Sequence, residues 1–387
     1  MEKVKLGEIA LLINGDRGKN YPSQEDITDD GEVPFVNAGH LNGKNIDYSD
    51  MNYISQEKYE KLSSGKFEKG DILYCLRGSL GKKAIVNDEV RGAIASSLVI
   101  IRPDRKKVNG DYLMFSLDAP TIREQLTKAN NGSTQPNLSA SSVREFRIEL
   151  PTLLVQKDVV EKLTKLQHVI EKRQNQINLL DKLVKARFVE MFGSCLNKVL
   201  IGDVISICRG ASPRPIQAYI TESLEGVNWI KIGDVSENSL YITKTAEKIT
   251  LEGAKKSRAV HAGNFILSNS MSFGRPYILG IDGYVHDGWL ILSNFRDTFN
   301  ELYLYYALRN EYVQQQFHGK VNGATVKNLN SDLVKATYIQ VPDMYSQKVF
   351  ADFVKQVDKS KVVVPSKIKN TIFAIMLSVS FGQITSI

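Results

Sequence analysis

The sequence has few cysteines and no long apolar run, and each absence excludes a class of protein. Its three cysteines, Cys75, Cys195 and Cys208, are odd in number and lack CxxC spacing, which argues against a disulfide framework and against a zinc site. This usage indicates a reducing compartment, so we expect a cytoplasmic protein. Residues 372–379, the most apolar stretch of the tail, are far fewer than the roughly 20 residues of a membrane span. We therefore expect no membrane association.

Motifs for catalysis are missing as well. The amino-methyltransferase signature, Asp or Asn followed by Pro-Pro and an aromatic residue, does not occur, and no glycine-rich cofactor loop follows a first strand. Residues 78–83 (GSLGKK) look like a phosphate loop, but the glycine spacing is wrong and Lys83 stands where Ser or Thr is required. The five histidines show neither metal-ligand nor triad spacing. The sequence favours a binding protein that has no catalytic residues and holds no metal.

The length and the charge are compatible with binding to a polyanion. A chain of 387 residues suits two or three domains, and a hydrophobic fraction of 42% is typical of a folded soluble protein. Fifty Lys and Arg against 43 Asp and Glu give a net charge of +7. This excess is modest, and solvated lysines explain it as well as a nucleic-acid partner does.

Residues 156–191 contain neither glycine nor proline and predict one long helix, about 54 Å in length. Its apolar residues alternate at spacings of four and three, which is typical of a coiled-coil seam, although Arg173 interrupts the pattern. Such a helix needs a partner to bury its seam. The seam residues are Val159, Leu163, Leu166, Ile170, Ile177, Leu180 and Val184.

The first half of the chain recurs in the second half. VKLGEI at residues 4–9 corresponds to VLIGDV at 199–204, and NGSTQPNLS at 131–139 corresponds to NGATVKNLN at 322–330. Between these pairs the offset drifts only from 195 to 191 residues. Each match is weak alone, but their common order indicates an internal repeat.

The repeat supplies a partner for the long helix. At an offset of 191 the seam continues as Phe350, Val354, Val357, Ile368 and Ile375. Pro365 falls inside this second copy and should break it, so we expect helices over residues 346–361 and 366–380.

Each half before its helix predicts an α+β domain, with strands such as 71–76 and 265–269 and helices such as 110–130 and 300–317. The expected fold is two similar α+β domains in tandem, each followed by a long helix, with the helices pairing as an antiparallel coiled coil with pseudo-twofold symmetry. We place the first domain at residues 1–151, the central helix at 152–195, the second domain at 196–342 and the C-terminal helical region at 343–387.

Three loops in each half carry glycines, cations, amides and hydroxyls, which can contact phosphates or base edges. They cover residues 14–20, 77–83 and 130–137, and correspondingly 209–214, 268–275 and 320–328. The same residue types also build turns and cap helices, and a purely structural role of these loops therefore stays open. The candidates in the first half are Arg17, Lys19, Asn20, Arg77, Ser79, Lys82, Lys83, Thr134, Gln135 and Asn137. Those in the second half are Arg209, Arg214, Ser268, Asn269, Ser270, Arg275, Lys320, Thr325, Lys327 and Asn328. For Trp229, Phe273 and Trp289, core packing is favoured over base stacking.

Two α+β halves with pairing helices resemble the specificity (S) subunit of type I restriction-modification systems. The resemblance rests on the half starts VKLGEI and VLIGDV, on GDILYCLRGSLGK, on NGSTQPNLS before the Leu150-Pro151 hinge, and on the helix openings QKDVVEKL and QKVFADFV. It implies that each half is a target recognition domain that reads one part of a split double-stranded DNA sequence, while the helices space the two domains.

The resemblance also implies the partners. They are two methyltransferase (M) subunits, which use S-adenosylmethionine, and restriction (R) subunits, which use ATP and Mg; this chain would bind no cofactor and catalyse no reaction. Two alternatives remain at this point. One is the recognition subunit of another restriction class, and the other is an interaction scaffold that binds protein or glycan through two β-rich domains.

Overall fold

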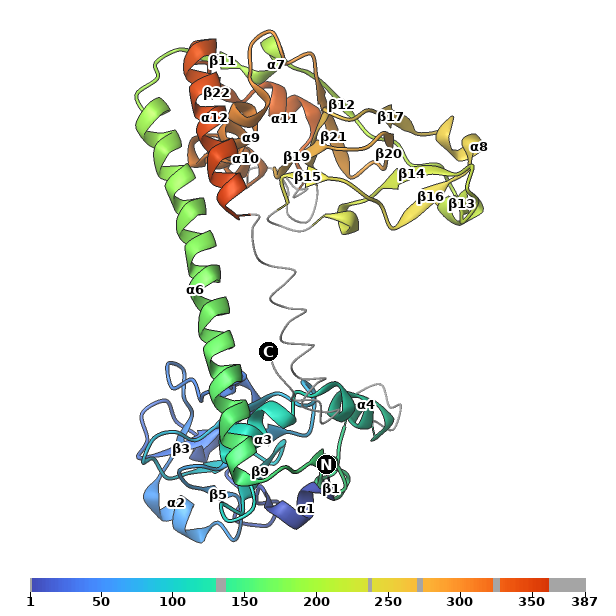
Figure 1. The fold of residues 1–387 in the computed structure, drawn as a ribbon. Coiled ribbons are helices and arrows are strands. Elements are labelled where there is room, and N and C mark those ends of the chain that lie inside the picture. Colours follow the sequence, from blue (N-terminus) through green and yellow to red (C-terminus); the bar gives the residue numbers. More distant parts are fainter. Residues whose placement is uncertain (1, 130–136, 236–238, 270–273, 323–327, 362–387) are drawn as a thin grey trace. The chain divides into compact units, whose positions relative to one another are not determined.

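The computed structural model describes residues 2–129, 137–235, 239–269, 274–322 and 328–361 (Figure 1). The described residues divide into two compact units, one up to Arg173 and the other from Gln174 onward. Each unit combines sheets with short helices, so the predicted α+β class is confirmed for both.

The first unit contains two four-stranded sheets and one strand pair. Across the central sheet the order is β2 (Ala10–Asn14), β9 (Leu98–Pro103), β6 (Ile72–Cys75) and β7 (Lys83–Ile85). The other sheet is β4 (Tyr53–Ile54), β3 (Val33–Val36), β8 (Gly92–Ile94) and β5 (Lys66–Phe67), and the pair is β1 (Lys3–Lys5) with β10 (Arg147–Glu149). The short helices are α1 (Leu6–Ile9), α2 (Gln56–Lys61), α3 (Gly110–Ser116), α4 (Pro120–Ala129) and α5 (Ala140–Arg144).

The second unit repeats this plan with two five-stranded sheets. The central sheet is β12 (Ser206–Arg209), β21 (Trp289–Ser293), β18 (Phe265–Ser268), β19 (Pro276–Leu279) and β15 (Tyr241–Ile242). The other sheet is β13 (Ile220–Thr221), β16 (Glu247–Ile249), β14 (Val227–Ile230), β20 (Gly283–Val285) and β17 (Arg258–Val260), and the pair is β11 (Lys198–Leu200) with β22 (Tyr338–Gln340). The helices are α7 (Ile201–Val204), α8 (Leu251–Ala254), α9 (Glu301–Arg309), α10 (Glu311–Asn322), α11 (Ser331–Lys335) and α12 (Met344–Lys361).

The predicted repeat is visible in the strand registers. Val4 pairs with Ile148 between β1 and β10, and Val199 pairs with Ile339 between β11 and β22. These two pairs differ by 195 and 191 positions, which are the offsets found in the sequence. The duplication therefore extends from the sequence to the three-dimensional pairing.

Both faces of β6, in the middle of the first central sheet, are buried, which explains why this strand is apolar throughout. In β6, Ile72 and Tyr74 pack into the core that includes α3, while Leu73 and Cys75 pack against the second sheet. Alternate residues of a strand point to opposite faces, so each face has a core of its own.

Each of the two short helices expected within the domains is divided into two. Residues 110–129 form α3 and α4, with Pro120 as the first residue of α4, where proline is favoured because no N–H is required. The stretch 300–317 forms α9 and α10, because Asn310 adopts an extended conformation and its side chain accepts a hydrogen bond from the Tyr312 backbone N–H at 2.9 Å.

The long helix is confirmed as α6 (Leu153–Phe192), which Figure 1 shows as one continuous green ribbon. Its seam is buried at the two ends and half-buried between them. Val159 and Leu163 belong to the core of the first unit, and Val184 belongs to the core of the second. The half-buried seam residues are Leu166, Ile170, Ile177 and Leu180, together with Arg173.

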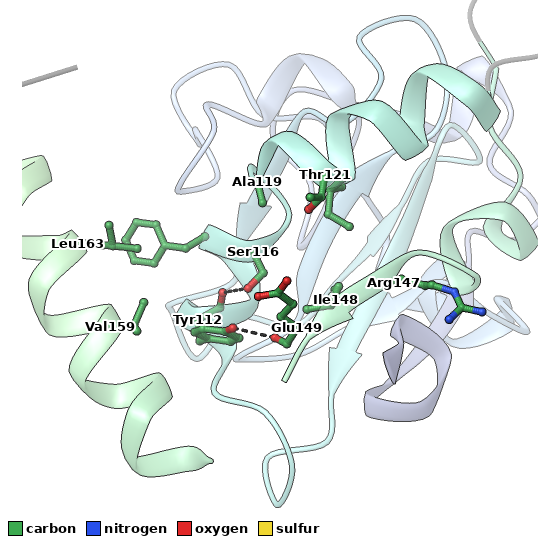
Figure 2. Close-up of a pocket in the computed structure, with 11 residues that line it drawn as sticks. Tyr112, Ser116, Ala119, Thr121, Arg147, Ile148, Glu149, Val159 and Leu163 are labelled. Atoms are coloured by element: carbon green, nitrogen blue, oxygen red, sulfur yellow. Dashed lines mark hydrogen bonds between the residues drawn. The ribbon is translucent and has the colours of Figure 1, made fainter. Parts of the chain in front are cut away.

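The first turns of α6 pack on α3 and β10 around a small cavity of about 40 Å³ (Figure 2). The Tyr112 hydroxyl donates to the Glu149 backbone carbonyl at 2.7 Å beside it. Burial raises the pKa of the Glu149 carboxyl in this cavity. The cavity belongs to the packing of helix on domain, and its lining includes none of the candidate binding residues.

In the second unit α12 is the partner of α6. Phe350, Val354 and Val357, which the repeat assigns to the seam, lie in one core with Val184. At the end of α12 the Lys361 ammonium forms an ion pair with Asp181 of α6 at 2.7 Å. The helix expected over residues 346–361 is thus confirmed, whereas Ile368, Ile375 and Pro365 lie outside the described residues. No helix among those described is both long and apolar enough to span a membrane.

Candidate nucleic-acid interface

In the first half the described parts of the three predicted loops lie around one turn, residues 95–97, which leads into β9. The Gly15 backbone lies against this turn so closely that an added Cβ atom would sit 2.8 Å from the Ala95 oxygen. Leu76, at the end of β6, donates its N–H to the Ser97 carbonyl at 2.9 Å, and Leu138 donates to Leu76 at 2.8 Å. The described parts of the loops therefore lie beside one another at one edge of the central sheet.

Three of the five candidate cations of the first half are exposed at the surface. Arg17, Lys19 and Arg77 are exposed, as are Ser79 and Asn137. The Arg17 guanidinium donates to the Ser96 carbonyl at 3.4 Å. An antiparallel bridge between Arg77 and Asn137 brings two of the loops together, whereas Thr134 and Gln135 lie outside the described residues.

Three candidates of the first half serve the fold instead. The side-chain amide of Asn20 donates to the Lys61 carbonyl at 2.8 Å, and the Lys82 ammonium donates to the Ala38 carbonyl at 2.8 Å. Lys83 is a correction, because its side chain is only 3% exposed and its ammonium is paired with Asp118. A buried ammonium needs such a partner and cannot reach a phosphate.

In the second half the corresponding turn is residues 286–288, before β21. Gly210 donates its N–H to the Trp289 carbonyl at 2.8 Å, and Asn269 donates to Gly288 at 3.0 Å. Leu329, at the end of the third loop, donates to the Asn269 carbonyl at 2.9 Å. The arrangement is the same as in the first half.

Only some candidates of the second half lie at the surface. Arg209, Arg214 and Asn328 are exposed, and Arg275 is half-buried. Ser268 and Asn269 are corrections, because they are 1% and 4% exposed. The described residues do not include Ser270, Thr325 or Lys327, nor the side chain of Lys320, which lies on α10.

The buried pair Ser268 and Asn269 builds the turn. The Ser268 hydroxyl accepts from the Arg275 backbone N–H at 3.1 Å, and the Asn269 amide donates to the Asp287 carbonyl at 2.9 Å. Trp229 and Trp289 are 1% and 0% exposed, which confirms that they pack in the core, while Phe273 lies outside the described residues.

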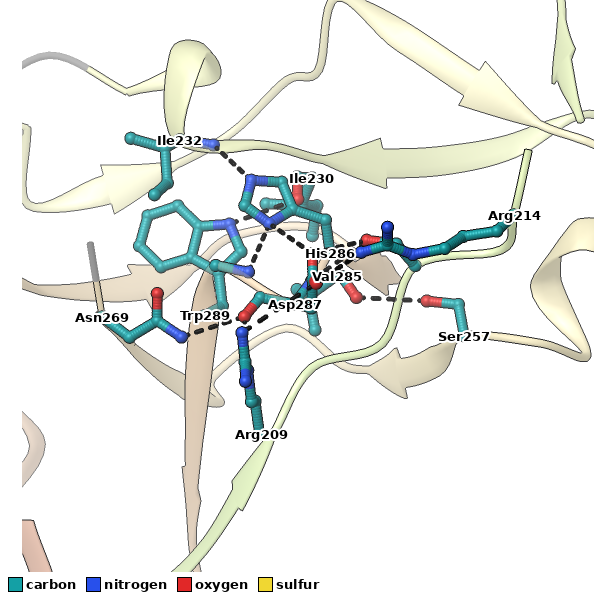
Figure 3. Close-up of polar contacts among 12 residues, drawn as sticks. Arg209, Arg214, Ile230, Ile232, Ser257, Asn269, Val285, His286, Asp287 and Trp289 are labelled. Atoms are coloured by element: carbon teal, nitrogen blue, oxygen red, sulfur yellow. Dashed lines mark hydrogen bonds and ion pairs between the residues drawn. The ribbon is translucent and has the colours of Figure 1, made fainter. Parts of the chain in front are cut away.

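Asp287 is the residue that the sequence reading missed, and Figure 3 shows it at the centre of the polar contacts. Its carboxylate accepts from the Ser212 hydroxyl at 2.8 Å and from the Arg214 guanidinium at 3.2 Å, and Arg209 lies 3.9 Å away. Burial acts to raise the pKa of Asp287, but the hydrogen bonds from the Ser212 hydroxyl and from the Asp287 backbone, together with the charge of Arg209, outweigh it, so the pKa lies below its usual value. The group is therefore ionised at neutral pH.

His286 shapes the same turn as a neutral imidazole. Its Nδ1 accepts from the Gly288 backbone N–H at 2.6 Å, which a protonated ring could not do. Burial lowers the pKa of His286.

The repeat itself is the signal in the sequence that could have pointed to His286 and Asp287. Residues 286–288 stand 191 positions after residues 95–97 and precede an equally apolar strand.

An open cavity of about 620 Å³ adjoins this turn. Pro213, Arg214 and Ile216 line one part of it, and Trp229 and Asp287 line another. Among the residues that the structure describes, no group of three His, Cys, Asp or Glu side chains could hold a metal ion. The exposed donors instead suit phosphates and base edges.

Comparison with known proteins also finds one match in each half of the chain. The sequence profile of the family described as type I restriction modification DNA specificity domain matches residues 1–179 and 196–373. The type I restriction enzyme MjaVIII specificity subunit of Methanocaldococcus jannaschii is 21% identical over 394 residues, covering 92% of this chain and 86% of that protein. The EcoBI specificity subunit of Escherichia coli is 23% identical over 189 residues, covering 49% and 39%.

Two solved structures share the fold. A chain from a study of complex assembly and conformational transition of the type I restriction-modification system matches with a TM-score of 0.61 and 17% identity, covering 97% of this chain and 96% of that one. The S subunit from M. genitalium matches with a TM-score of 0.52 and 14% identity, covering 98% and 94%. With two profile matches that follow its internal repeat, this chain belongs to the type I restriction modification DNA specificity domain family.

Proposed function

We propose that this chain is the non-catalytic specificity subunit of a type I restriction-modification complex and reads a split sequence in double-stranded DNA. The observation that supports this most directly is the duplicated loop surface. In both halves, the described parts of loops rich in Arg, Lys, Asn and Ser follow corresponding strands and lie around the turn before β9 or β21. Two such surfaces on one chain suit a target with two parts.

On each surface some side chains suit contacts that provide affinity, and others suit contacts that provide sequence selectivity. Exposed cations such as Lys19 and Arg77 suit phosphates, which supply affinity without sequence information. Exposed Arg209 and Arg214 can also make bidentate contacts with a base. The corresponding positions differ between the halves, as two readers of different half-sites require.

The partners follow from the same assignment. Two methyltransferase subunits and the restriction subunits would assemble on this chain, and S-adenosylmethionine, ATP and Mg would be bound by them. The specificity-subunit names of the relatives and the absence of catalytic motifs from this sequence support this part of the proposal.

A domain exchange tests the proposed function. Residues 1–150 are replaced by those of a related specificity subunit, and methylated adenines are mapped by single-molecule sequencing in cells that also express the methyltransferase. We expect one part of the methylated sequence to change while the other part and the gap stay the same. A change in both parts would contradict the modular reading.

A binding measurement separates this proposal from an interaction scaffold for protein or glycan. The affinity of the chain with its methyltransferase for random duplex DNA should fall steeply as the salt concentration rises, because phosphate contacts release counterions. Absent or salt-independent binding would favour the scaffold.

A further inference from the structure

At the turn before the central strand the second half carries an acidic residue that two arginines of its loop surface approach, and the first half carries none at that turn. At the turn before the central strand the second half has Asp287, and the first half has Ser96. Arg209 and Arg214 approach the Asp287 carboxylate at 3.9 and 3.2 Å. In the first half, Arg17 reaches only the backbone carbonyl of Ser96, at 3.4 Å. This difference between equivalent sites requires an explanation.

The carboxylate is held in place before any ligand arrives. The Ser212 hydroxyl donates to it at 2.8 Å and accepts from the Asp287 backbone N–H at 3.2 Å, so acid and turn are fixed together. The Asp287 carbonyl accepts from Arg209 Nε at 2.8 Å and from the Asn269 amide at 2.9 Å. Figure 3 shows the two arginines converging on this one residue from the strand and loop that precede it in the chain.

Stability alone does not explain these ion pairs. The side chains of Arg209 and Arg214 are 60% and 80% exposed, and ion pairs at such exposure contribute little to folding. Each guanidinium has five N–H donors, of which Asp287 occupies one or two. The remaining donors are left for a ligand, and the bond that each guanidinium makes to Asp287 favours one orientation, which helps recognition of a planar acceptor.

Among base pairs, G·C fits this set of groups. In the major groove guanine offers two acceptors, O6 and N7, which match the fork of an arginine, and cytosine offers an amino donor beside them. A phosphate would gain nothing from a neighbouring carboxylate, which repels it. Lys231, the other cation at the adjacent cavity, is already paired with Glu247.

We propose that Arg209 and Arg214 read a guanine in the half-site of the second domain and that Asp287 is the positioning residue that orients them. This inference rests on the proposed function. It assigns a G·C pair to the half-site that the second domain reads. The first domain has Ser96 at the position of Asp287, so no acid-oriented pair of arginines is assigned to it.

The test uses the full chain in complex with its methyltransferase subunits. Methylated adenines are mapped first, to define the two half-sites, and affinity is then measured on duplexes in which each guanine of the second half-site is replaced by 7-deazaguanine, which lacks the N7 acceptor. One such replacement should weaken binding of the wild-type complex about tenfold. In Asp287→Asn this penalty should shrink to about twofold, with the first half-site read as before.

Two further variants make the result specific. Asp332→Asn removes the same charge from another exposed ion pair of the second unit, with Lys335 at 3.6 Å, and should keep the full penalty. Arg214→Lys keeps the charge but loses the bidentate fork, so it should lose discrimination as Asp287→Asn does, even if the latter folds poorly.

The outcomes separate the two proposals. If no methylated sequence depends on this chain, the proposed function is wrong and the inference falls with it. If a split sequence is methylated but its second half-site lacks guanine, or if Asp287→Asn and Arg214→Lys keep the wild-type penalty, only the guanine assignment is overturned.

Discussion

Gln156 and Gln347 occupy the same position in the two halves, 191 residues apart, and make the same set of hydrogen bonds. Both side chains are completely buried. The side-chain oxygen of Gln156 accepts from the Asn109 backbone N–H at 2.7 Å. The side-chain amide group of Gln156 donates to the backbone carbonyls of Lys107 and Pro151 at 3.1 and 2.8 Å. Gln347 makes the equivalent bonds with the backbones of Asn300, Thr298 and Pro342, at 2.8, 3.0 and 2.9 Å. Each glutamine ties the start of its long helix to its domain.

Replacing Gln156 by Leu should destabilise the first unit by about 2–4 kcal/mol, because the Asn109 N–H and two carbonyls would be left buried without partners. Gln174→Leu is the matched control, since Gln174 is exposed on the same helix and bonds only to Asn178, at 3.2 Å. Urea unfolding monitored by circular dichroism measures both. Equal midpoints for the two variants would contradict a role for Gln156 as a structural tie.

Two lysines of the first half should affect DNA binding differently. Lys19→Ala removes an exposed cation, so affinity should fall for all sequences alike, and the slope of log K against log salt should decrease by about 0.9. Lys83→Met should leave that slope unchanged, because the Lys83 ammonium is already paired with Asp118 inside the fold. Fluorescence anisotropy over a salt series measures both slopes. A reduced slope for Lys83→Met would indicate that Lys83 contacts DNA phosphates after all.

The division between these lysines shows what the sequence could and could not predict. The repeat, the long helix and the loop surfaces follow from patterns that local chemistry imposes, and the structure contains all of them. The direction of a side chain within a turn depends on a distant partner, such as Asp118 for Lys83 or Asp287 for Asn269. Asp287 itself belongs to no motif, because a single acid in a turn has no signature until its neighbours in space are known.

The stability of the second unit should depend on pH through His286. Burial lowers the pKa of the folded imidazole below 6.5, so the unfolded chain binds more protons as the pH falls below about 6.5. The stabilising contribution is complete above that pH and is lost on acidification. The charged groups that face the ring are Asp287, Asp234 and Lys231. The pKa of Asp287 lies below its ordinary value, so this carboxylate stays ionised across the window.

Thermal unfolding between pH 5 and 8 measures this effect. The wild-type melting temperature should fall between pH 6.5 and pH 5. His286→Ala, which introduces the residue found at the same position of the first half, should show a flatter profile. Identical profiles for the two proteins would exclude His286 as the source of the pH dependence.

The hydrogen bond from the Gly288 N–H to the His286 ring shapes the turn that carries Asp287. Discrimination between guanine and 7-deazaguanine at the second half-site should therefore weaken over the same pH range.

The middle of α6 offers a test of the helix as a spacer. Leu166 packs against the core of the first unit and Leu180 against that of the second, while Ile170 and Ile177 between them belong to neither core. An insertion of four residues after Arg173 therefore leaves both packed ends intact and adds about 6 Å of helix. At roughly 3.4 Å for each base pair, the unread gap in the methylated sequence should lengthen by about two base pairs while both half-sites keep their sequences. The control Gln174→Ala changes the same exposed segment without adding length, and should leave the gap as it is. If the insertion variant methylates with an unchanged gap, the separation of the half-sites is set by contacts other than the length of this helix.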